Sequence, residues 1–496
     1  MSHVSIDQGS GLPLYRQLAE SIRNAIRSGA LGSGTRLPAT RELAGQLGLN
    51  RTTVSAAYSL LEEAGLLEGQ VGRGSFVSVN GRPEPVSAAA QASSFDWEAL
   101  LPPIEGWSSP VAGIAINFSS SRPAREHFPM PEFRRLSKEV IDSAEAPEIL
   151  QLGSPYGYAP LRNYLLEQNA LTGVARVHDD LIVTNGCQQA LDLLARVLVT
   201  ENTPVLIEDP GYHGLQRVFG RAGANFIPIP SGGESGLNVQ ALEALVDQHR
   251  PRLLVVTPDF QNPTGLTLSL DKRKAILALA RRHGVAVIES QIYRDLRYAG
   301  EALPSLKQLD ETGNVISIGS YSKIAFPGLR VGWVIAPSPV IARLAEAKQT
   351  SDLHSDHLSQ AVLLRFAESG ELARHLKRTR QAGEERLRAV LESCAEHLPA
   401  GTWFSRPQGG MNLWIDLTAP LTADTLLRAA EERGVTFLPG PYFSVRRSHM
   451  RGLRISFGSL SPETIAHGIA ILGSIAKEQF AGHQARARLE PVAAVV

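Results

Sequence analysis

The stretch SIGSYSKIAFPGLRVGW, residues 317–333, decides the fold of the larger part of the chain. An apolar, strand-like run leads into a serine-rich turn that holds Lys323, and the turn continues into Pro-Gly-Leu-Arg. A lysine beside small hydroxyl groups can form an imine with an aldehyde, and serines near an arginine suit a phosphate. An isolated motif of this kind is more often a surface loop, so its meaning depends on the sequence around it.

Apolar runs and amphipathic helices alternate on both sides of this stretch. Each run is short, β-branched and apolar on both faces, as buried parallel strands are. Helical patterns such as GCQQALDLLARVL and DKRKAILALARRH lie between several of the runs. The alternation predicts an α/β domain over residues 114–478. The runs are LIVTN (181–185), PVLIED (204–209), RLLVVTP (252–258), VAVIES (285–290), NVISIGS (314–320) and VGWVIA (331–336).

Residues 11–79 carry a different pattern. A short helix that Thr40 could cap ends at Gly48, and Asn50 can cap a second helix with apolar residues at inward spacing. Two helices joined by a tight turn predict a helix-turn-helix, followed in EGQVGRGSFVSV (68–79) by two strands that form a wing. In this geometry the start of the second helix faces the major groove and the wing tip reaches the backbone or minor groove. The residues so placed are Arg51, Thr52, Thr53 and, in the wing, Arg73.

This N-terminal segment resembles the GntR family of winged-helix regulators over nearly all of residues 11–79. The likeness includes Leu37-Pro38, Ala57-Tyr58 and the glycines of the wing. In that family, residues matching Arg41 and Arg51 contact operator DNA. The resemblance therefore implies that double-stranded operator DNA is a partner. Ala39 stands where the family usually has serine, which removes one possible phosphate hydrogen bond.

Further motifs follow in order along the large domain. They are TNGCQQ (184–189), EDPGY (208–212), NPTG (262–265), the serine-rich turn with Lys323, and LRISF (453–457). Together they resemble the fold type I pyridoxal-phosphate enzymes, the aminotransferase group, over about residues 114–478. The resemblance implies that Lys323 is the Schiff-base lysine and that Arg454 grips a ligand carboxylate. It assigns to pyridoxal 5′-phosphate the residues Gly186, Cys187, Gln188, Tyr212, Asn262, Ser290, Tyr293, Ser320, Ser322 and Arg330.

Two positions depart from the pattern of that group. The usual Glu-Asp-Asp is here Glu289-Ser290-Gln291, and the first Asp of the pattern pairs with the pyridine nitrogen. A carboxylate there keeps the nitrogen protonated, whereas a serine can only hydrogen-bond a mostly neutral nitrogen. Glu289 should point to the opposite face of its strand. We therefore expect transamination to be weak or absent. Leu152 stands where a tyrosine reaches the partner subunit's phosphate, so we expect a lowered cofactor affinity.

The order of the two domains resembles the MocR/GabR-type subfamily of GntR regulators. This resemblance implies a transcription regulator in which an amino compound displaces Lys323 from the cofactor and changes operator binding. It also implies a head-to-tail homodimer. Two other functions stay open. The chain could be a working aminotransferase, which an Asp at position 290 would have favoured. It could also be a regulator whose large domain no longer binds the cofactor, as Ser290 and Leu152 would allow.

Composition narrows the remaining choices. Lys and Arg number 49 together, as do Asp and Glu, so any nucleic-acid contact must be local. Two distant cysteines argue against a disulfide framework and fit a reducing cytoplasm. No apolar run reaches the roughly 18 residues of a membrane span, and the start lacks an export segment. We expect a cytoplasmic protein without a metal site, with a linker at residues 80–113 and a flexible tail at 479–496.

Overall fold

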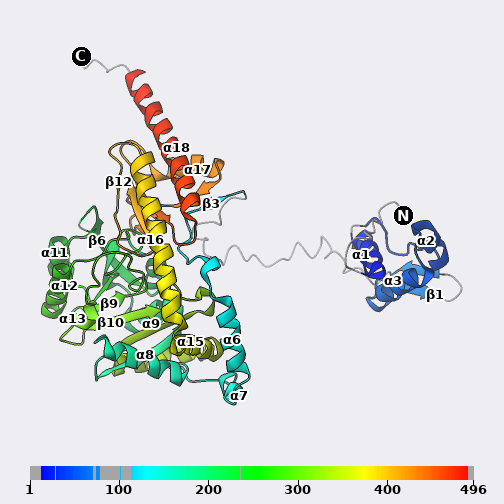
Figure 1. Cartoon of the computed structure of the whole chain (residues 1–496), viewed down its shortest axis with the longest axis horizontal. Coiled ribbons are helices and arrows are strands. Elements are labelled where there is room, and N and C mark those ends of the chain that lie inside the picture. The colour runs from blue at the N-terminus through cyan, green and yellow to red at the C-terminus, as the bar shows by residue number, and fades with distance from the viewer. Residues whose placement is uncertain are drawn as a thin grey trace. The chain divides into compact units, whose positions relative to one another are not determined.

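The computed structural model describes residues 13–27, 29–70, 74–78, 101, 113–234 and 236–489. The chain divides into two compact units, residues 1–106 and 107–496 (Figure 1). The division falls within the segment for which the sequence predicts a linker. Most of that segment, residues 80–113, lies outside the described residues.

The described residues of the first unit form three helices and a hairpin. Strands β1 and β2 pair antiparallel, from Leu67 opposite Val77 to Gln70 opposite Gly74. The apolar faces of the helices meet in one core that includes Leu18, Leu43 and Leu61. The elements are α1 (Leu14–Arg27), α2 (Thr40–Leu47), α3 (Arg51–Glu63), β1 (Leu67–Gln70) and β2 (Gly74–Val77).

Local signals explain two of the helix ends in this unit. Gly48 ends α2 in the left-handed region with φ 64°, where a residue without Cβ meets no steric penalty. The side chain of Asn50 accepts a hydrogen bond from the Thr52 amide at 3.2 Å, so its predicted role as the cap of α3 is confirmed. The expectation for Thr40 is wrong, because Ala39 occupies the capping position of α2 and makes no side-chain cap.

The second unit is built around an eight-stranded sheet in the order β4-β11-β10-β9-β8-β5-β6-β7. Strands β10, β9, β8, β5 and β6 run parallel to one another. The strands are β4 (Asp179–Asn185), β5 (Thr203–Asp209), β6 (Ala224–Gly232), β7 (Gly236–Leu237), β8 (Leu253–Val256), β9 (Ala286–Ser290), β10 (Val315–Ser320) and β11 (Val331–Pro337).

One of the predicted parallel strands is antiparallel. Strand β11, the run VGWVIA, pairs antiparallel with both β10 and β4. A parallel connection needs a crossover of a dozen or more residues, usually a helix. Only residues 321–330 separate β10 from β11, so the chain turns back beside β10.

Helices cover both faces of this sheet, because successive strand residues point to opposite sides. Val205 and Ile207 pack with α9, α10 and α14, whereas Leu206 between them packs with α11 and α12. Helices α8 and α15 pack against β4 and β11. The helices are α8 (Ala159–Leu171), α9 (Gly186–Leu198), α10 (His213–Arg221), α11 (Val239–His249), α12 (Leu270–His283), α13 (Leu306–Leu309), α14 (Ser338–Ser351) and α15 (His357–Glu368).

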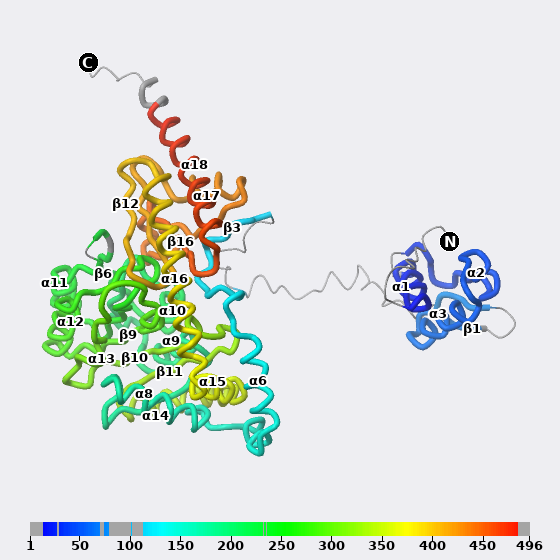
Figure 2. Tube along the Cα trace, in the orientation of Figure 1, coloured from blue at the N-terminus to red at the C-terminus, as the bar shows by residue number. Residues whose placement is uncertain are grey.

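A smaller antiparallel sheet, β12-β13-β16-β15, forms the other part of the second unit. Helices α16 and α18 run side by side along it (Figure 2). Strand β3 (Ile116–Asn117) joins this part by pairing in parallel with β14 (Val435–Thr436). The other elements are β12 (Trp403–Phe404), β13 (Asn412–Asp416), β15 (Leu438–Pro439), β16 (Gly452–Ser456), α16 (Glu371–His397), α17 (Ala423–Glu432) and α18 (Pro462–Leu489).

The last helix corrects the predicted start of the flexible tail. Helix α18 continues to Leu489, so residues 479–489 are helical. Phe480 packs against the core of the smaller sheet, and Gln479 Nε2 donates to the Thr425 carbonyl at 3.1 Å. These contacts hold the helix beyond residue 478. None of the described helices combines the length and the apolar character that a membrane crossing requires.

Candidate cofactor site and DNA-contacting surface

Lys323 lies in the turn after β10, beside the first segment of the second unit. Its Nζ donates to the Ser121 carbonyl at 2.5 Å and lies 5.7 Å from the ring centre of Tyr293. The hydroxyls of Ser121 and Tyr293 are 3.2 Å apart. Lys323 and Tyr293, two of the predicted site residues, thus both contact the segment of residues 119–122, which we call the strap.

Arg454, in the middle of β16, contacts the same strap. Its Nη2 donates to the Ser119 carbonyl, and its Nη1 donates to Asn262 Oδ1 at 3.1 Å. The side chain is buried, and its Nε has no hydrogen-bond partner among the described residues. Burial lowers the pKa of Arg454 to about 10, which keeps the guanidinium charged at neutral pH. A buried guanidinium with an open donor suits a carboxylate ligand.

The start of α9 and the turn after β10 form a candidate phosphate cradle. Arg330 Nη2 donates to the Asn185 carbonyl at 3.3 Å, and its Nη1 donates to Ser322 Oγ at 3.4 Å. Ser320 Oγ donates to Ser322 Oγ at 3.0 Å. A Cβ on Gly186, which has φ 76°, would lie 2.4 Å from the Arg330 guanidinium. The turn therefore requires glycine, and its donors fit a phosphate.

Tyr212 closes another side of this cradle. Its hydroxyl donates to Gln188 Oε1 at 3.0 Å, and the residue remains 38% exposed. This leaves a ring surface open to a flat ligand. Cys187 lies in the first turn of α9, within the cradle. Burial raises the pKa of its thiol, which is therefore protonated at neutral pH.

Ser290 is the last residue of β9, and it places a hydroxyl where the aminotransferase pattern has a carboxylate. The preceding Glu289 is fully buried and accepts hydrogen bonds from the amides of Leu306 and Lys307 in α13, at 2.6 and 3.0 Å. Burial raises the pKa of Glu289. The prediction that Glu289 points away from Ser290 is confirmed, because Ser290 shares the strand face of Ile288, which packs with α9.

The predicted cofactor residues lie at or after the ends of five strands of the sheet and meet at one edge. Parallel strands β5, β8, β9 and β10, together with β4, end there, and such edges are where α/β sheets bind ligands. Leu152, by contrast, is 71% exposed. Its effect on cofactor affinity stays a prediction.

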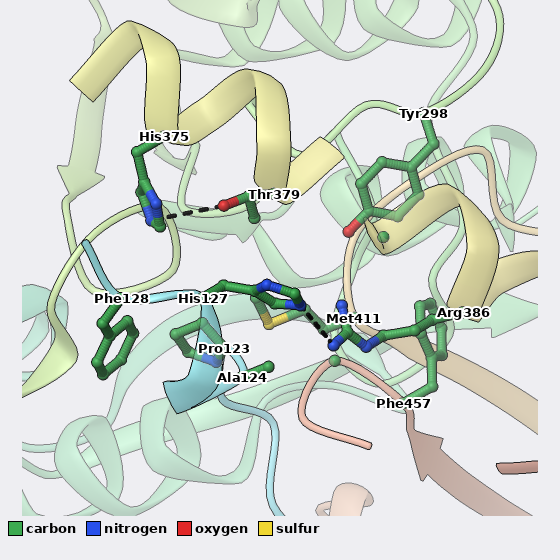
Figure 3. Close-up of a pocket in the computed structure, with 12 residues that line it drawn as sticks. Pro123, Ala124, His127, Phe128, Tyr298, His375, Thr379, Arg386, Met411 and Phe457 are labelled. Atoms are coloured by element: carbon green, nitrogen blue, oxygen red, sulfur yellow. Dashed lines mark hydrogen bonds between the residues drawn. The ribbon is translucent and has the colours of Figure 1, made fainter. Parts of the chain in front are cut away.

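A separate cavity lies beyond the strap (Figure 3). It is lined by Pro123 and His127 from the segment after the strap and by His375 and Arg386 from α16. Arg386 Nη2 and His127 Nε2 are 2.9 Å apart. Burial lowers the pKa of His375 to about 4, so this imidazole is neutral at neutral pH. None of the predicted cofactor residues lines this cavity, which is therefore distinct from the Lys323 site.

The predicted DNA-contacting residues lie in the first unit. Arg51 and Thr52 are exposed at the start of α3, next to the half-buried Thr53. Arg41 is exposed in the first turn of α2. Arg73 lies outside the described residues. The four described side chains are accessible to a ligand, and their contacts with DNA stay a prediction.

Sequence reasoning missed the strap. Its contacts with Lys323 and Arg454 come from the main-chain carbonyls of Ser121 and Ser119, and these carry no side-chain signature. The only available signal is position, because the strap directly follows the first strand after the predicted linker.

The fold and the two sites define a transcription regulator: a winged-helix DNA-binding unit joined to an effector unit of aminotransferase fold that takes pyridoxal phosphate. The model of bacterial regulatory proteins of the gntR family matches residues 14–77, and that of aminotransferase class I and II matches residues 114–472. The chain belongs to the GntR regulators of the MocR type, which carry an aminotransferase class I and II domain. The expected fold class, cofactor and regulator function are thereby confirmed.

Three relatives illustrate the match. The probable rhizopine catabolism regulatory protein MocR of Rhizobium meliloti is 31% identical over 481 residues, which is 95% of each chain. The 2-aminoadipate transaminase of Thermus thermophilus is 36% identical over 366 residues, covering 73% of this chain and 90% of the relative. The crystal structure of LysN, an alpha-aminoadipate aminotransferase from Thermus thermophilus, complexed with N-(5′-phosphopyridoxyl)-L-leucine, matches with a TM-score of 0.70 and 35% identity. That match covers 75% of this chain and 94% of LysN.

Proposed function

We propose that this regulator senses a carboxylate-bearing amino compound between Lys323 and Arg454. The observation that carries the proposal is that both cations, one of them deeply buried, donate to carbonyls of a single short segment. A carbonyl is a neutral acceptor and forms a weaker hydrogen bond with a cation than a carboxylate does. A ligand carboxylate is therefore expected to replace the strap at Arg454.

The residues of the second unit have separate roles in this proposal. The start of α9, Ser322 and Arg330 would hold the cofactor phosphate, and Tyr212 would cover the ring. Lys323 would hold the cofactor through its amine. When bound, pyridoxal phosphate supplies an aldehyde that combines with primary amines. Arg454 would orient the incoming ligand through its carboxylate.

The strap offers a physical route from this site to the first unit. Strap residues follow β3 directly, and β3 follows the predicted linker. A ligand can change DNA binding only if it binds one state of the protein more tightly than another. The protein with the strap in contact with Arg454 and the protein with the strap displaced would be two such states. We further propose a homodimer, with the head-to-tail arrangement that the family resemblance implies. The sedimentation mass of the purified chain tests whether it is a dimer.

Binding of two matched adducts tests the proposed site. N-(5′-phosphopyridoxyl)-L-leucine carries the cofactor, an amine and a carboxylate, whereas the adduct of 3-methylbutylamine lacks only the carboxylate. We expect the leucine adduct to speed deuterium exchange at the strap amides of the cofactor-free chain. The decarboxylated adduct should leave that exchange slow, because nothing competes for Arg454. Equal exchange with both adducts would contradict the proposal.

Replacement of Arg51 by alanine tests the DNA-contacting surface. We expect it to weaken binding to the operator by about 1–3 kcal/mol and to relax specificity, because Arg51 is predicted to contact a base. Binding is measured at fixed salt to duplexes from upstream of the gene and its neighbours. Arg23→Ala removes the same charge from an ion pair in α1 with Glu20 and serves as the control. A footprint unchanged in Arg51→Ala would rule out the role.

A working aminotransferase is the second candidate function. The 36% identity to a transaminase favours it. The position of Ser290 argues against it, since no neighbouring carboxylate of β9 faces the same side. We propose that turnover is weak and that sensing is the main role of the site.

A further inference from the structure

A buried ion pair contacts the turn that begins α9. Lys348, near the end of α14, has a side chain with no exposed surface, and its Nζ donates to both carboxylate oxygens of Asp352 at 2.7 Å. Burial lowers the pKa of Lys348, and the Asp352 carboxylate opposes that shift. Keeping an amine away from water is costly unless it is well paired. The function proposed above gives this amine no role.

The ion pair is tied to both ends of the candidate phosphate cradle. Asp352 Oδ2 accepts hydrogen bonds from Asn185 Nδ2 at 2.7 Å and from Gln189 Nε2 at 2.6 Å. Gln189 Oε1 accepts in turn from Lys348 Nζ at 3.2 Å and from the Asn185 amide at 2.7 Å. The four side chains form one closed network, and the cradle residues Gly186, Cys187 and Gln188 lie between its two ends.

This network prevents the usual role of an asparagine at a helix start. Asn185 occupies the N-cap position of α9, where asparagine normally accepts a hydrogen bond from an amide of the first turn. Its side chain makes no such bond, because its amide group donates to Asp352 instead. The first-turn amides are therefore not capped by Asn185. Helix N-termini with open amides bind phosphate groups.

We propose that Lys348 and Asp352 are positioning residues that hold the Asn185 side chain away from the start of α9 and so keep its amides open to the cofactor phosphate. The inference rests on the cradle assigned under the proposed function. Without the ion pair, Asn185 is free to rotate and cap α9 itself. It then competes with the phosphate for the same donors.

The paired replacement Lys348→Met with Asp352→Leu tests the inference, because it removes both charges and leaves none buried alone. We expect the Kd of the full chain for pyridoxal phosphate to rise about tenfold, the size of one or two lost hydrogen bonds. The Kd for pyridoxal, which lacks the phosphate, should stay within about twofold. Both values come from absorbance titration of the cofactor-free protein.

A second buried pair provides the matched control. Lys307 Nζ and Asp179 Oδ1 are 2.9 Å apart, and both side chains are almost fully buried. Lys307→Met with Asp179→Leu repeats the chemical change elsewhere in the same unit and should leave the ratio of the two Kd values unchanged. Adding Asn185→Ala to the first variant should restore much of the lost phosphate preference, since alanine cannot cap α9.

Several results would overturn the inference. One is an equal loss of affinity for pyridoxal phosphate and pyridoxal, and another is the same change of ratio in the control pair. If the paired variant does not fold, Lys348→Gln with Asp352→Ala removes both charges and also removes the oxygen that accepts from Asn185. An unchanged ratio in that variant also refutes the proposal. A wild-type chain that binds both compounds equally would instead refute the cradle, so the two failures are distinguishable.

Discussion

Replacement of Lys323 by alanine is expected to abolish covalent attachment of pyridoxal phosphate and the response of operator binding to amino compounds. In the structure, Nζ of Lys323 is the amine that reaches the strap, next to Tyr293. Alanine has no amine to combine with the aldehyde. The purified variant, incubated with the cofactor, should lack the visible absorbance band of a lysine-bound cofactor. Its operator affinity without cofactor should equal that of the wild type.

The control for this variant is Lys274→Ala, which replaces an exposed lysine of α12. It should keep both the absorbance band and the operator response. Loss of the single hydrogen bond from Lys323 to the Ser121 carbonyl should cost about 1 kcal/mol of stability, so the variant should fold. A band that persists in Lys323→Ala would disprove the assignment of the lysine. A wild type with no band would favour a regulator whose large unit has lost the cofactor.

Local sequence patterns predicted the elements that depend on local physics. The cap at Asn50, the inward residues of α3 and the alternation of buried strands with helices follow from hydrogen bonding and periodicity within a few residues. The direction of β11 did not follow, because apolar runs look alike in parallel and antiparallel central strands. Connection length was the usable signal: residues 321–330 are too few for a crossover.

The candidate site divided in the same way. Lys323, Arg454 and the start of α9 carry recognisable side chains, so their motifs could be named before the structure was known. The contacts that join these residues could not be predicted from the sequence. Ser119 and Ser121 act through main-chain carbonyls, and Asp352 meets Asn185 across 167 positions of the chain. Such contacts arise from tertiary packing and leave no periodic pattern in the sequence.

Replacement of Ser290 by aspartate is expected to raise transaminase activity, which we expect to be weak or absent in the wild type, to measurable turnover. Ser290 shares the strand face of Ile288 on the side of α9, and it matches the position from which an aspartate pairs with the pyridine nitrogen. A carboxylate there would hold a proton on that nitrogen and make the ring a better acceptor of electrons. We expect a gain of about a hundredfold, the size that one partner of a developing charge contributes.

The measurement is keto-acid production from L-2-aminoadipate, the substrate named in the similar transaminase, with pyridoxal phosphate and an acceptor keto acid. Ser290→Asn is the matched control, because asparagine has the size of aspartate and can hydrogen-bond but carries no charge. It should show no gain. Equal gains in both variants would mean that the shape of the side chain limits turnover. A wild type as active as Ser290→Asp would mean that the missing carboxylate does not limit turnover. Since Glu289 stays bonded to α13 in either variant, any difference between them comes from the charge at position 290.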